Sequence, residues 1–335
     1  MGRYVVHKTG LFTGTIVVLT ALMLPLFTAA QRPVQVRRIA FLGFGPPSAA
    51  APDPFVEAFR QALHAHRWTE GHNLAIEWRW AEGSLDHFAT LVTEVIGLQV
   101  EVIVVPNGTM AGIAKQATST IPIVVVSGGS YASRSDLIAS LARPGGNVTG
   151  LAGLGPEILP KRLQLLKEAL PGVTWVAVLR GLESFTQELQ AMEAAAPSLG
   201  VELHLFDVRE PTAFDSAFAA MASAQAQALF VLGGRFLASY RQRIVDLAAQ
   251  YRLPASCPGR QYVEAGCLMG YGSNQRDRGL KIATYVDKIL HGAKPADLPV
   301  EQVMRFEFVI NLKTAQTLGL TLPPMVLFQA DEIIR

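Results

Sequence analysis

The sequence predicts an α/β protein made of two doubly wound parallel-sheet lobes joined by a hinge. Short apolar runs alternate with amphipathic stretches from Arg37 onward, and this alternation breaks once and then restarts. Alternating strands and helices favour a parallel sheet that is covered on both faces. The roughly 300 residues beyond Ala30 exceed one ordinary core and suit two domains.

The first half contains four predicted strands with helices between them. The apolar run at 100–105 is typical of a strand buried on both faces. The apolar spacing within 55–63 is that of one helix face. The predicted strands are 38–43, 73–80, 100–105 and 121–126, and the predicted helices are 55–63, 86–98 and 109–118.

The turn-forming residues at 143–147 interrupt the series and are predicted to be the first crossing between lobes. The second half repeats the pattern, and 270–274 is the predicted return crossing. Its predicted helices are 157–170, 183–199, 213–224 and 238–251, and its predicted strands are 175–179, 202–207, 228–232, 254–257 and 268–271. A helix at 277–291 and a strand at 306–311 follow. We therefore expect a first lobe of 37–148 plus about 275–312, a second lobe of 149–274, and a tail at 313–335 that belongs to either lobe.

Residues 1–30 have the features of an export signal. Arg3 and Lys8 precede an apolar stretch at 11–27, and small residues at 28–30 come before Gln31. We expect cleavage near Ala30 and a periplasmic product. The alternative is a retained membrane anchor, although the apolar stretch is at the short limit for a spanning helix.

Charge and cysteine content narrow the function classes. The leader carries two of the 29 basic residues and none of the 27 acidic ones, so the remaining chain is balanced. Balanced charge argues against a nucleic-acid or anionic-membrane partner, because both functions require a basic face. Cys257 and Cys267 lie ten residues apart, and export permits either a disulfide or two free thiols.

No known catalytic or cofactor motif occurs in the chain. G-x-S-x-G, H-E-x-x-H, the phosphate-binding loop and G-x-G-x-x-G are all missing. We therefore expect no enzymatic activity, no cofactor and no metal. His64 and His66 are two apart on a helix and do not share a face, which favours solvated side chains over a metal site.

Candidate ligand contacts come from loops that follow predicted strands, since ligands of open α/β sheets bind beyond the carboxyl ends of the strands. Asn107 and Thr109 either contact a ligand or simply cap the following helix. Arginines in the second half either pair with a ligand carboxylate or form solvent-exposed or interlobe ion pairs. The full candidate set is Phe44, Gly45, Asn107, Thr109, Ser127, Gly128, Ser130, Tyr131, Arg180, Arg235, Phe236, Arg260, Tyr262 and Tyr271.

Several ordered blocks resemble a known family. The matching blocks are 68–73, 77–83, 115–122, 140–150, 161–167, 263–266, 284–290 and 306–313. On these residues the chain resembles substrate-binding proteins of ABC transporters with the type I periplasmic-binding-protein fold, in the branch that includes tryptophan and tyrosine binders. The resemblance implies a monomeric receptor that captures a small solute, such as an amino acid or other small carboxylate, and delivers it to an ABC permease of the inner membrane.

Two other classes remain open from the sequence. A ligand-sensing extracytoplasmic domain that reports to a signalling partner would share the same two lobes, and a retained leader would favour it. An exported α/β enzyme is the third class. Genes for a permease and an ATPase beside this one would favour transport.

Overall fold

The computed structural model describes residues 1–2, 36–44, 53–127, 136–153, 155, 157–181, 186–302 and 305–335. The chain divides into two units, Met1–Val34 and Gln35–Arg335. Apart from residues 1–2, the predicted leader lies outside the described residues. Within the described residues, no helix combines the length and apolar character that crossing a bilayer requires.

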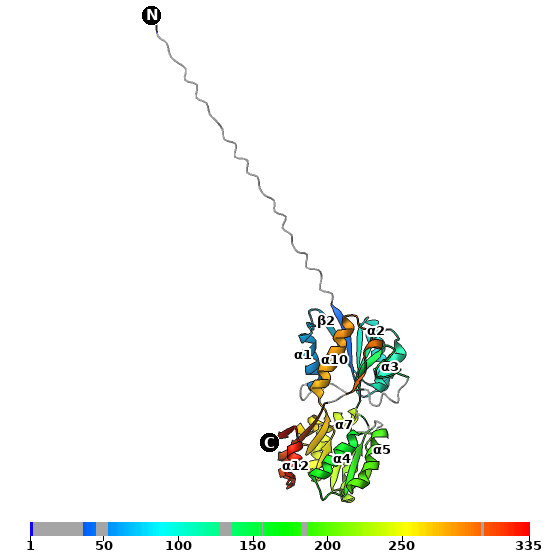
Figure 1. The fold of residues 1–335 in the computed structure, drawn as a ribbon, viewed down its shortest axis with the longest axis vertical. Coiled ribbons are helices and arrows are strands. Elements are labelled where there is room, and N and C mark those ends of the chain that lie inside the picture. The colour runs from blue at the N-terminus through cyan, green and yellow to red at the C-terminus, as the bar shows by residue number, and fades with distance from the viewer. Residues whose placement is uncertain are drawn as a thin grey trace. The chain divides into compact units, whose positions relative to one another are not determined.

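The second unit contains two sheets, and we call each sheet with its helices a lobe (Figure 1). In spatial order, the six-stranded sheet of lobe 1 consists of β11 (Glu301–Gln302), β5 (Val148–Ala152), β4 (Ile123–Ser127), β3 (Val102–Asn107), β1 (Arg37–Gly43) and β2 (Leu74–Trp80). The seven-stranded sheet of lobe 2 consists of β13 (Glu332–Ile334), β12 (Phe306–Asn311), β10 (Met269–Ser273), β9 (Ala255–Cys257), β8 (Ala228–Val231), β6 (Trp175–Arg180) and β7 (Glu202–Asp207).

Both sheets follow one winding rule. The first five strands of lobe 1 in chain order are arranged β2-β1-β3-β4-β5, and those of lobe 2 are arranged β7-β6-β8-β9-β10. Each is therefore the doubly wound 2-1-3-4-5 order, with a reversal point between its first and third strands. The expected fold class and the expected internal doubling are confirmed.

Helices cover both faces of the sheet in lobe 1, because its strands bury alternate residues on opposite sides. On one face, α1 (Pro54–Ala65) and α10 (Gln275–Leu290) pack on Ile39 and Val104. On the other face, α2 (Leu85–Gly97) and α3 (Gly108–Ala117) pack on Leu42 and Ile103. Figure 1 shows α1 and α10 lying side by side.

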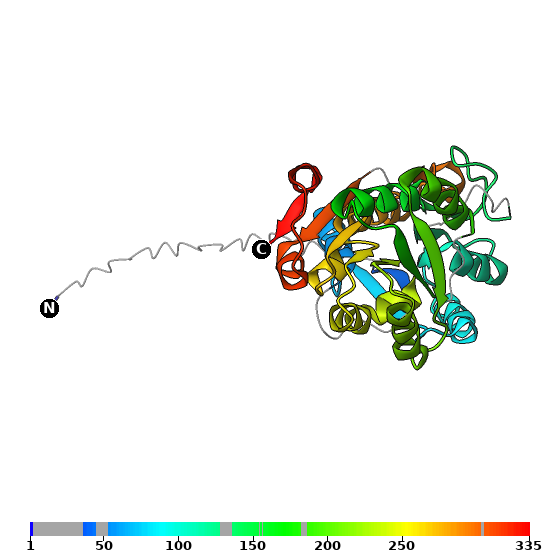
Figure 2. The same ribbon diagram turned by 90° about the horizontal axis from the view of Figure 1, so that it is seen from below.

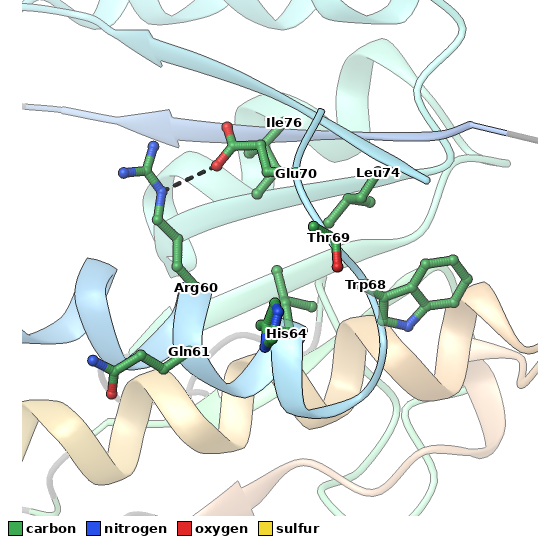
Figure 3. A pocket seen from close by; sticks show the side chains of 9 residues that line it. Arg60, Gln61, His64, Trp68, Thr69, Glu70, Leu74 and Ile76 are labelled. Carbon is green, nitrogen blue, oxygen red and sulfur yellow. Dashed lines mark ion pairs between the residues drawn. The ribbon is translucent and has the colours of Figure 1, made fainter. Parts of the chain in front are cut away.

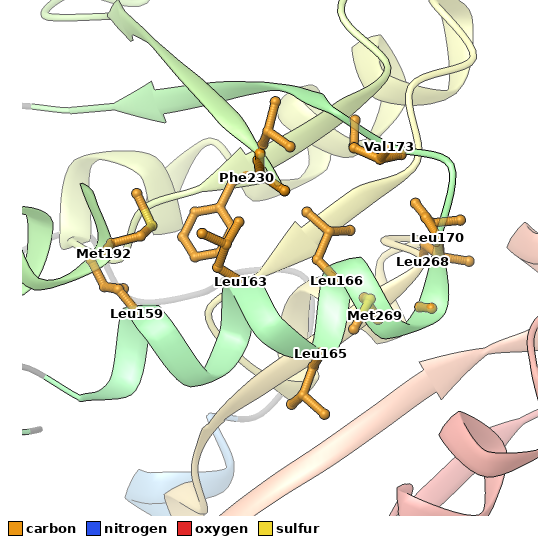
Figure 4. Packing of buried hydrophobic residues seen from close by; sticks show 14 of the residues in the cluster. Leu159, Leu163, Leu165, Leu166, Leu170, Val173, Met192, Phe230, Leu268 and Met269 are labelled. Carbon is orange, nitrogen blue, oxygen red and sulfur yellow. The ribbon is translucent and has the colours of Figure 1, made fainter. Parts of the chain in front are cut away.

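Lobe 2 is layered in the same way. On one face, α4 (Ile158–Ala169) and α5 (Thr186–Ala195) pack on Val178 and Phe230. Figure 4 shows Leu159, Leu163 and Leu166 projecting from α4 into this core beside Phe230. The opposite face carries α6 (Ala213–Ser223), α7 (Arg235–Ser239), α8 (Arg241–Gln250) and α9 (Arg260–Glu264).

Two boundaries differ from the expected ones. The first crossing was expected at 143–147, but β5 follows that turn and pairs with β4, so the chain leaves lobe 1 only after Ala152. The strand at 306–311 was expected in lobe 1, but β12 pairs antiparallel with β10 of lobe 2. The sequence alone does not show with which strand a short apolar run pairs. That pairing depends on contacts between residues that are distant in sequence.

The C-terminal tail belongs to lobe 2. It forms α11 (Leu312–Leu318), α12 (Pro324–Gln329) and β13, and β13 extends the sheet beside β12. Figure 2 shows this tail in red at the edge of the sheet.

Short 3-10 turns lie at η2 (Ala196–Leu199) and η3 (Pro295–Asp297). Cys257 and Cys267, whose pairing the sequence left open, form a disulfide with Cα atoms 6.6 Å apart.

Candidate functional site

Three short connections join the carboxyl edge of one sheet to the carboxyl edge of the other. Residues 153–157 lead from the end of β5 to the start of α4, and helices of such folds begin at the carboxyl edge. Asn274 alone separates the end of β10 from α10. Residues 303–305 lead from β11, which is parallel to β5, to β12, which is antiparallel to β10. The loops beyond both sets of strands are therefore connected at the edge where ligands of this fold class bind.

In lobe 1, the structure brings Asn107 and Ser127 together at this edge. They end the adjacent strands β3 and β4 and are register partners. The Asn107 side chain caps α3 by accepting a hydrogen bond from the Met110 amide at 3.0 Å. Its capping role is thus confirmed, and its place at the strand end leaves it beside Ser127 at the end of β4. Thr109, in the first turn of α3, is exposed.

Phe44 follows β1 at the same edge. Its carbonyl accepts a hydrogen bond from the Gly83 amide at 2.7 Å, which ties the end of β1 to the loop after β2. Its ring is partly buried against the core under α2 and α3. Four further candidates of this edge, Gly45, Gly128, Ser130 and Tyr131, lie outside the described residues.

In lobe 2, Arg180 ends β6 and pairs with Asp207 at the end of β7. Its Nε and Nη2 atoms donate to the two carboxylate oxygens at 2.5 and 2.8 Å. The hydrogen bond from Arg180 lowers the pKa of Asp207 below its usual value and raises the pKa of Arg180. The guanidinium is thus already held by a carboxylate of the protein.

Arg260 begins α9 and contacts three carboxylates. It donates to both oxygens of Glu332, at 3.0 and 2.5 Å, and lies 3.4 Å from Glu307 and 3.5 Å from Glu264. The hydrogen bond to Glu332 is the main reason that the pKa of Arg260 is raised. These contacts attach α9 to the edge strand β13 and to its neighbour β12.

Glu307 joins the Arg260 contacts to two of the three connections between the lobes. The Asn274 side-chain amide donates to Glu307 at 3.0 Å, while the Asn274 side-chain oxygen caps α10 through the Asp277 amide. Burial raises the pKa of Glu307, and the attraction of Arg260 opposes that effect. Arg305, on the third connection, bonds to Asp277 at 3.3 Å. The Asn274 backbone amide also donates to the Arg305 carbonyl at 3.3 Å, so a hydrogen bond links the two connections directly.

The predicted aromatic contacts in lobe 2 contribute to packing. Phe236 stacks on Phe214 with ring centroids 5.9 Å apart, and Tyr262 is only 5% exposed. Tyr271 stacks on Phe306 at 5.7 Å, and burial raises its pKa. The backbone of Arg235 begins α7, but its side chain lies outside the described part of the structure.

Sequence reasoning missed Arg162, which lies in α4 and is 2% exposed. It is four residues beyond Ile158 and four before Leu166, so it occupies the apolar face of the helix. Its Nη2 donates to the Val231 carbonyl at the end of β8. A charged residue at a position where the helical period requires an apolar one was the available signal.

Two cavities among the described residues lie away from these edges. One, of about 550 Å³, is bordered by α1 and the segment leading into β2, with His64, Trp68 and the Arg60–Glu70 ion pair in its wall (Figure 3). The other, of about 560 Å³, adjoins Arg252 and Cys267 in lobe 2. Over the same residues, no group of three or more His, Cys, Asp or Glu is arranged to hold a metal ion.

The family follows from the sequence match. The model of the ABC transporter substrate binding protein family matches residues 48–334, and the chain belongs to this family. Members of this family are solute-binding proteins and not enzymes.

Three relatives illustrate the match. The chain is 21% identical over 270 residues to the tyrosine-binding protein of Clostridioides difficile (strain R20291), covering 80% of this chain and 77% of the relative. It is similar, with a TM-score of 0.79 and 25% identity, to a Streptococcus pneumonia ABC domain in complex with L-Trp, over 90% of this chain and 100% of that one. A conserved domain protein from Vibrio cholerae gives a TM-score of 0.79 and 26% identity, over 89% and 100% of the two chains.

Proposed function

We propose that the chain is the periplasmic receptor of an ABC importer, which captures a small solute between its lobes by hinge closure and delivers it to an inner-membrane permease. The observation that carries this proposal is the pair of sheets with the same 2-1-3-4-5 order, joined through their carboxyl edges by three short connections. Several short crossings between two compact lobes make a hinge whose closure covers a ligand.

An aromatic amino acid is the first ligand class to test. This proposal rests on relatives that bind tyrosine and L-Trp, and on the aromatic side chains among the candidate contacts. Export with removal of residues 1–30 belongs to the same proposal, since the receptor must meet its ligand outside the inner membrane.

The proposed ligand contacts are the loops beyond the strands of both sheets. Asn107 and Ser127 offer polar groups from neighbouring strand ends of lobe 1, and Phe44 offers an aromatic ring beside them. The other proposed contacts in lobe 1 are Gly45, Thr109, Gly128, Ser130 and Tyr131, and those in lobe 2 are Arg180, Arg235, Phe236, Arg260, Tyr262 and Tyr271.

Calorimetric titration of the mature chain with the twenty L-amino acids tests the proposal. We expect saturable binding of at least one of them, with one ligand per chain. Ser127→Ala should weaken that binding by about 1–3 kcal/mol if the hydroxyl bonds the ligand, with little change in melting temperature. Ser198→Ala is the matched control, because its hydroxyl bonds the Ala195 carbonyl at the opposite end of lobe 2.

Arg260→Ala separates a ligand role from a structural one. Because the side chain contacts Glu264, Glu307 and Glu332, we expect this change to lower the melting temperature whatever it does to affinity. Unchanged affinity in both Ser127→Ala and Arg260→Ala would contradict the proposed site, and catalytic turnover of a bound solute would contradict the receptor function.

A further inference from the structure

Arg162 is a cation buried in lobe 2, and no carboxylate of the described residues forms an ion pair with it. Among the described residues, none of the ion pairs includes it, and its buried Nε has no hydrogen-bond partner. Arg180 and Arg260 differ from Arg162 in this respect, because each forms an ion pair with a carboxylate of the protein.

The contacts of Arg162 fix the plane of its guanidinium. The Arg162 Cζ lies 3.9 Å from the centre of the Phe230 ring, and Nη2 donates to the Val231 carbonyl. A guanidinium carries five N–H donors in a flat fork. Within the described residues, one face stacked on a ring and one donor bound to a carbonyl leave further donors in the plane for an anion, and Nε is among them.

Burying such a cation is unfavourable. Taking an ion out of water is strongly unfavourable unless a partner compensates for the lost hydration. Desolvation lowers the pKa of Arg162 to about 9, and the nearby Tyr262 phenol opposes this shift only in part. The side chain is thus still charged at neutral pH, and the described residues supply no carboxylate to balance that charge.

Arg162 also lies at the position where this fold binds ligands. Val231 ends β8, the third strand of lobe 2, which neighbours the first strand β6 at the reversal point of the sheet. The segment after β8 contains Gly233 and Gly234, and Gly234 has a φ of 115°. Glycine at such a φ permits backbone movements that other residues would resist.

We propose that Arg162 is the anion receptor of lobe 2 and binds the carboxylate of the solute through the free edge of its guanidinium. This inference rests on the proposed receptor function and names its ligand class, a solute that carries a carboxylate. Arg162 then selects the charge of the solute, beside the contacts proposed for the strand-end loops. A carboxylate bound there also supplies the missing counter-charge, so ligand binding and the stability of lobe 2 are coupled.

The test compares each acid with its amide. The mature chain is titrated with the twenty L-amino acids and benzoate, and the tightest-binding acid is then compared with its carboxamide, for example L-tryptophan with L-tryptophanamide. We expect the wild type to prefer the acid by about 10- to 100-fold, the range of a hydrogen bond to a charged group. Arg162→Gln should reduce that preference to about threefold or less, and Arg162→Lys should keep part of it.

The control and the contrary outcomes separate the two proposals. Arg252→Gln should preserve the preference, because Arg252 is exposed between α8 and β9 at the opposite edge of the sheet. If the wild type binds acid and amide equally, or Arg162→Gln keeps the full preference, the role of Arg162 is overturned while the receptor function stands. If no acid binds, both are overturned. Should Arg162→Gln not fold, the wild type and Arg162→Lys still decide the outcome.

Discussion

Replacing Cys257 and Cys267 together by alanine should destabilise lobe 2. The disulfide joins residues ten apart and closes the loop that contains α9 and Arg260. The loop-closure entropy for n of about ten residues is about 9 cal/mol/K, which corresponds to about 2.7 kcal/mol at 25 °C. Alanine suits both sites, because these side chains are 0% and 2% exposed and a serine hydroxyl there would need a partner.

Urea unfolding at pH 7 measures this loss. With a urea m-value of about 2 kcal/mol/M, the midpoint should fall by about 1–2 M. Fluorescence of Trp175, which stacks on His204 in lobe 2, reports this lobe. The wild type in strong reductant should approach the double variant, whereas the double variant should not respond to reductant. A midpoint within about 0.3 M of the wild type would refute loop constraint as the source of stability.

Three further predictions concern other parts of the chain. Product recovered from the periplasm should begin near Gln31 by N-terminal sequencing; an intact N-terminus in the membrane fraction would contradict export with cleavage. Gly279→Ala should cost about 1–3 kcal/mol in chemical unfolding, because a Cβ there would lie 2.5 Å from the Phe55 carbonyl oxygen where α10 meets α1; unchanged stability would mean that these helices separate easily. Asp207→Asn should cost at most about 1 kcal/mol near pH 6, since the pair with Arg180 is partly exposed. The folded pKa of Asp207 lies below 3.8, so this difference should vanish as the pH falls through that pKa, and a difference that persists in acid would contradict the ion pair.

Local periodicity predicted the layers of strands and helices correctly, but it placed two lobe boundaries wrongly. The buried runs that became β3 and β8 alternate with helices in both halves, and this repeat predicts two doubly wound sheets. The crossing after Ala152 and the place of β12 depend on strand pairing across the chain, which a sequence window does not contain.

For the candidate site, too, the sequence predicted some features and missed others. Position after a strand predicted that Asn107 and Ser127 lie at the same edge of the sheet, and the structure makes them register partners in adjacent parallel strands. Position after a strand does not indicate whether a side chain is already paired with another residue of the protein, as Arg180 is with Asp207. Arg162 is on a helix, so a search limited to strand-end loops did not reach it.

The central claim is that this chain binds a small solute and releases it unchanged. Its most direct test is calorimetric titration of the mature chain with the amino acid panel, followed by recovery of the bound compound and mass analysis. We predict one ligand per chain, a recovered mass identical to the mass added, and a stabilisation of about 2.7 kcal/mol at 100 times the dissociation constant. Saturating concentrations that bind no solute, or a recovered product of different mass, would contradict the account.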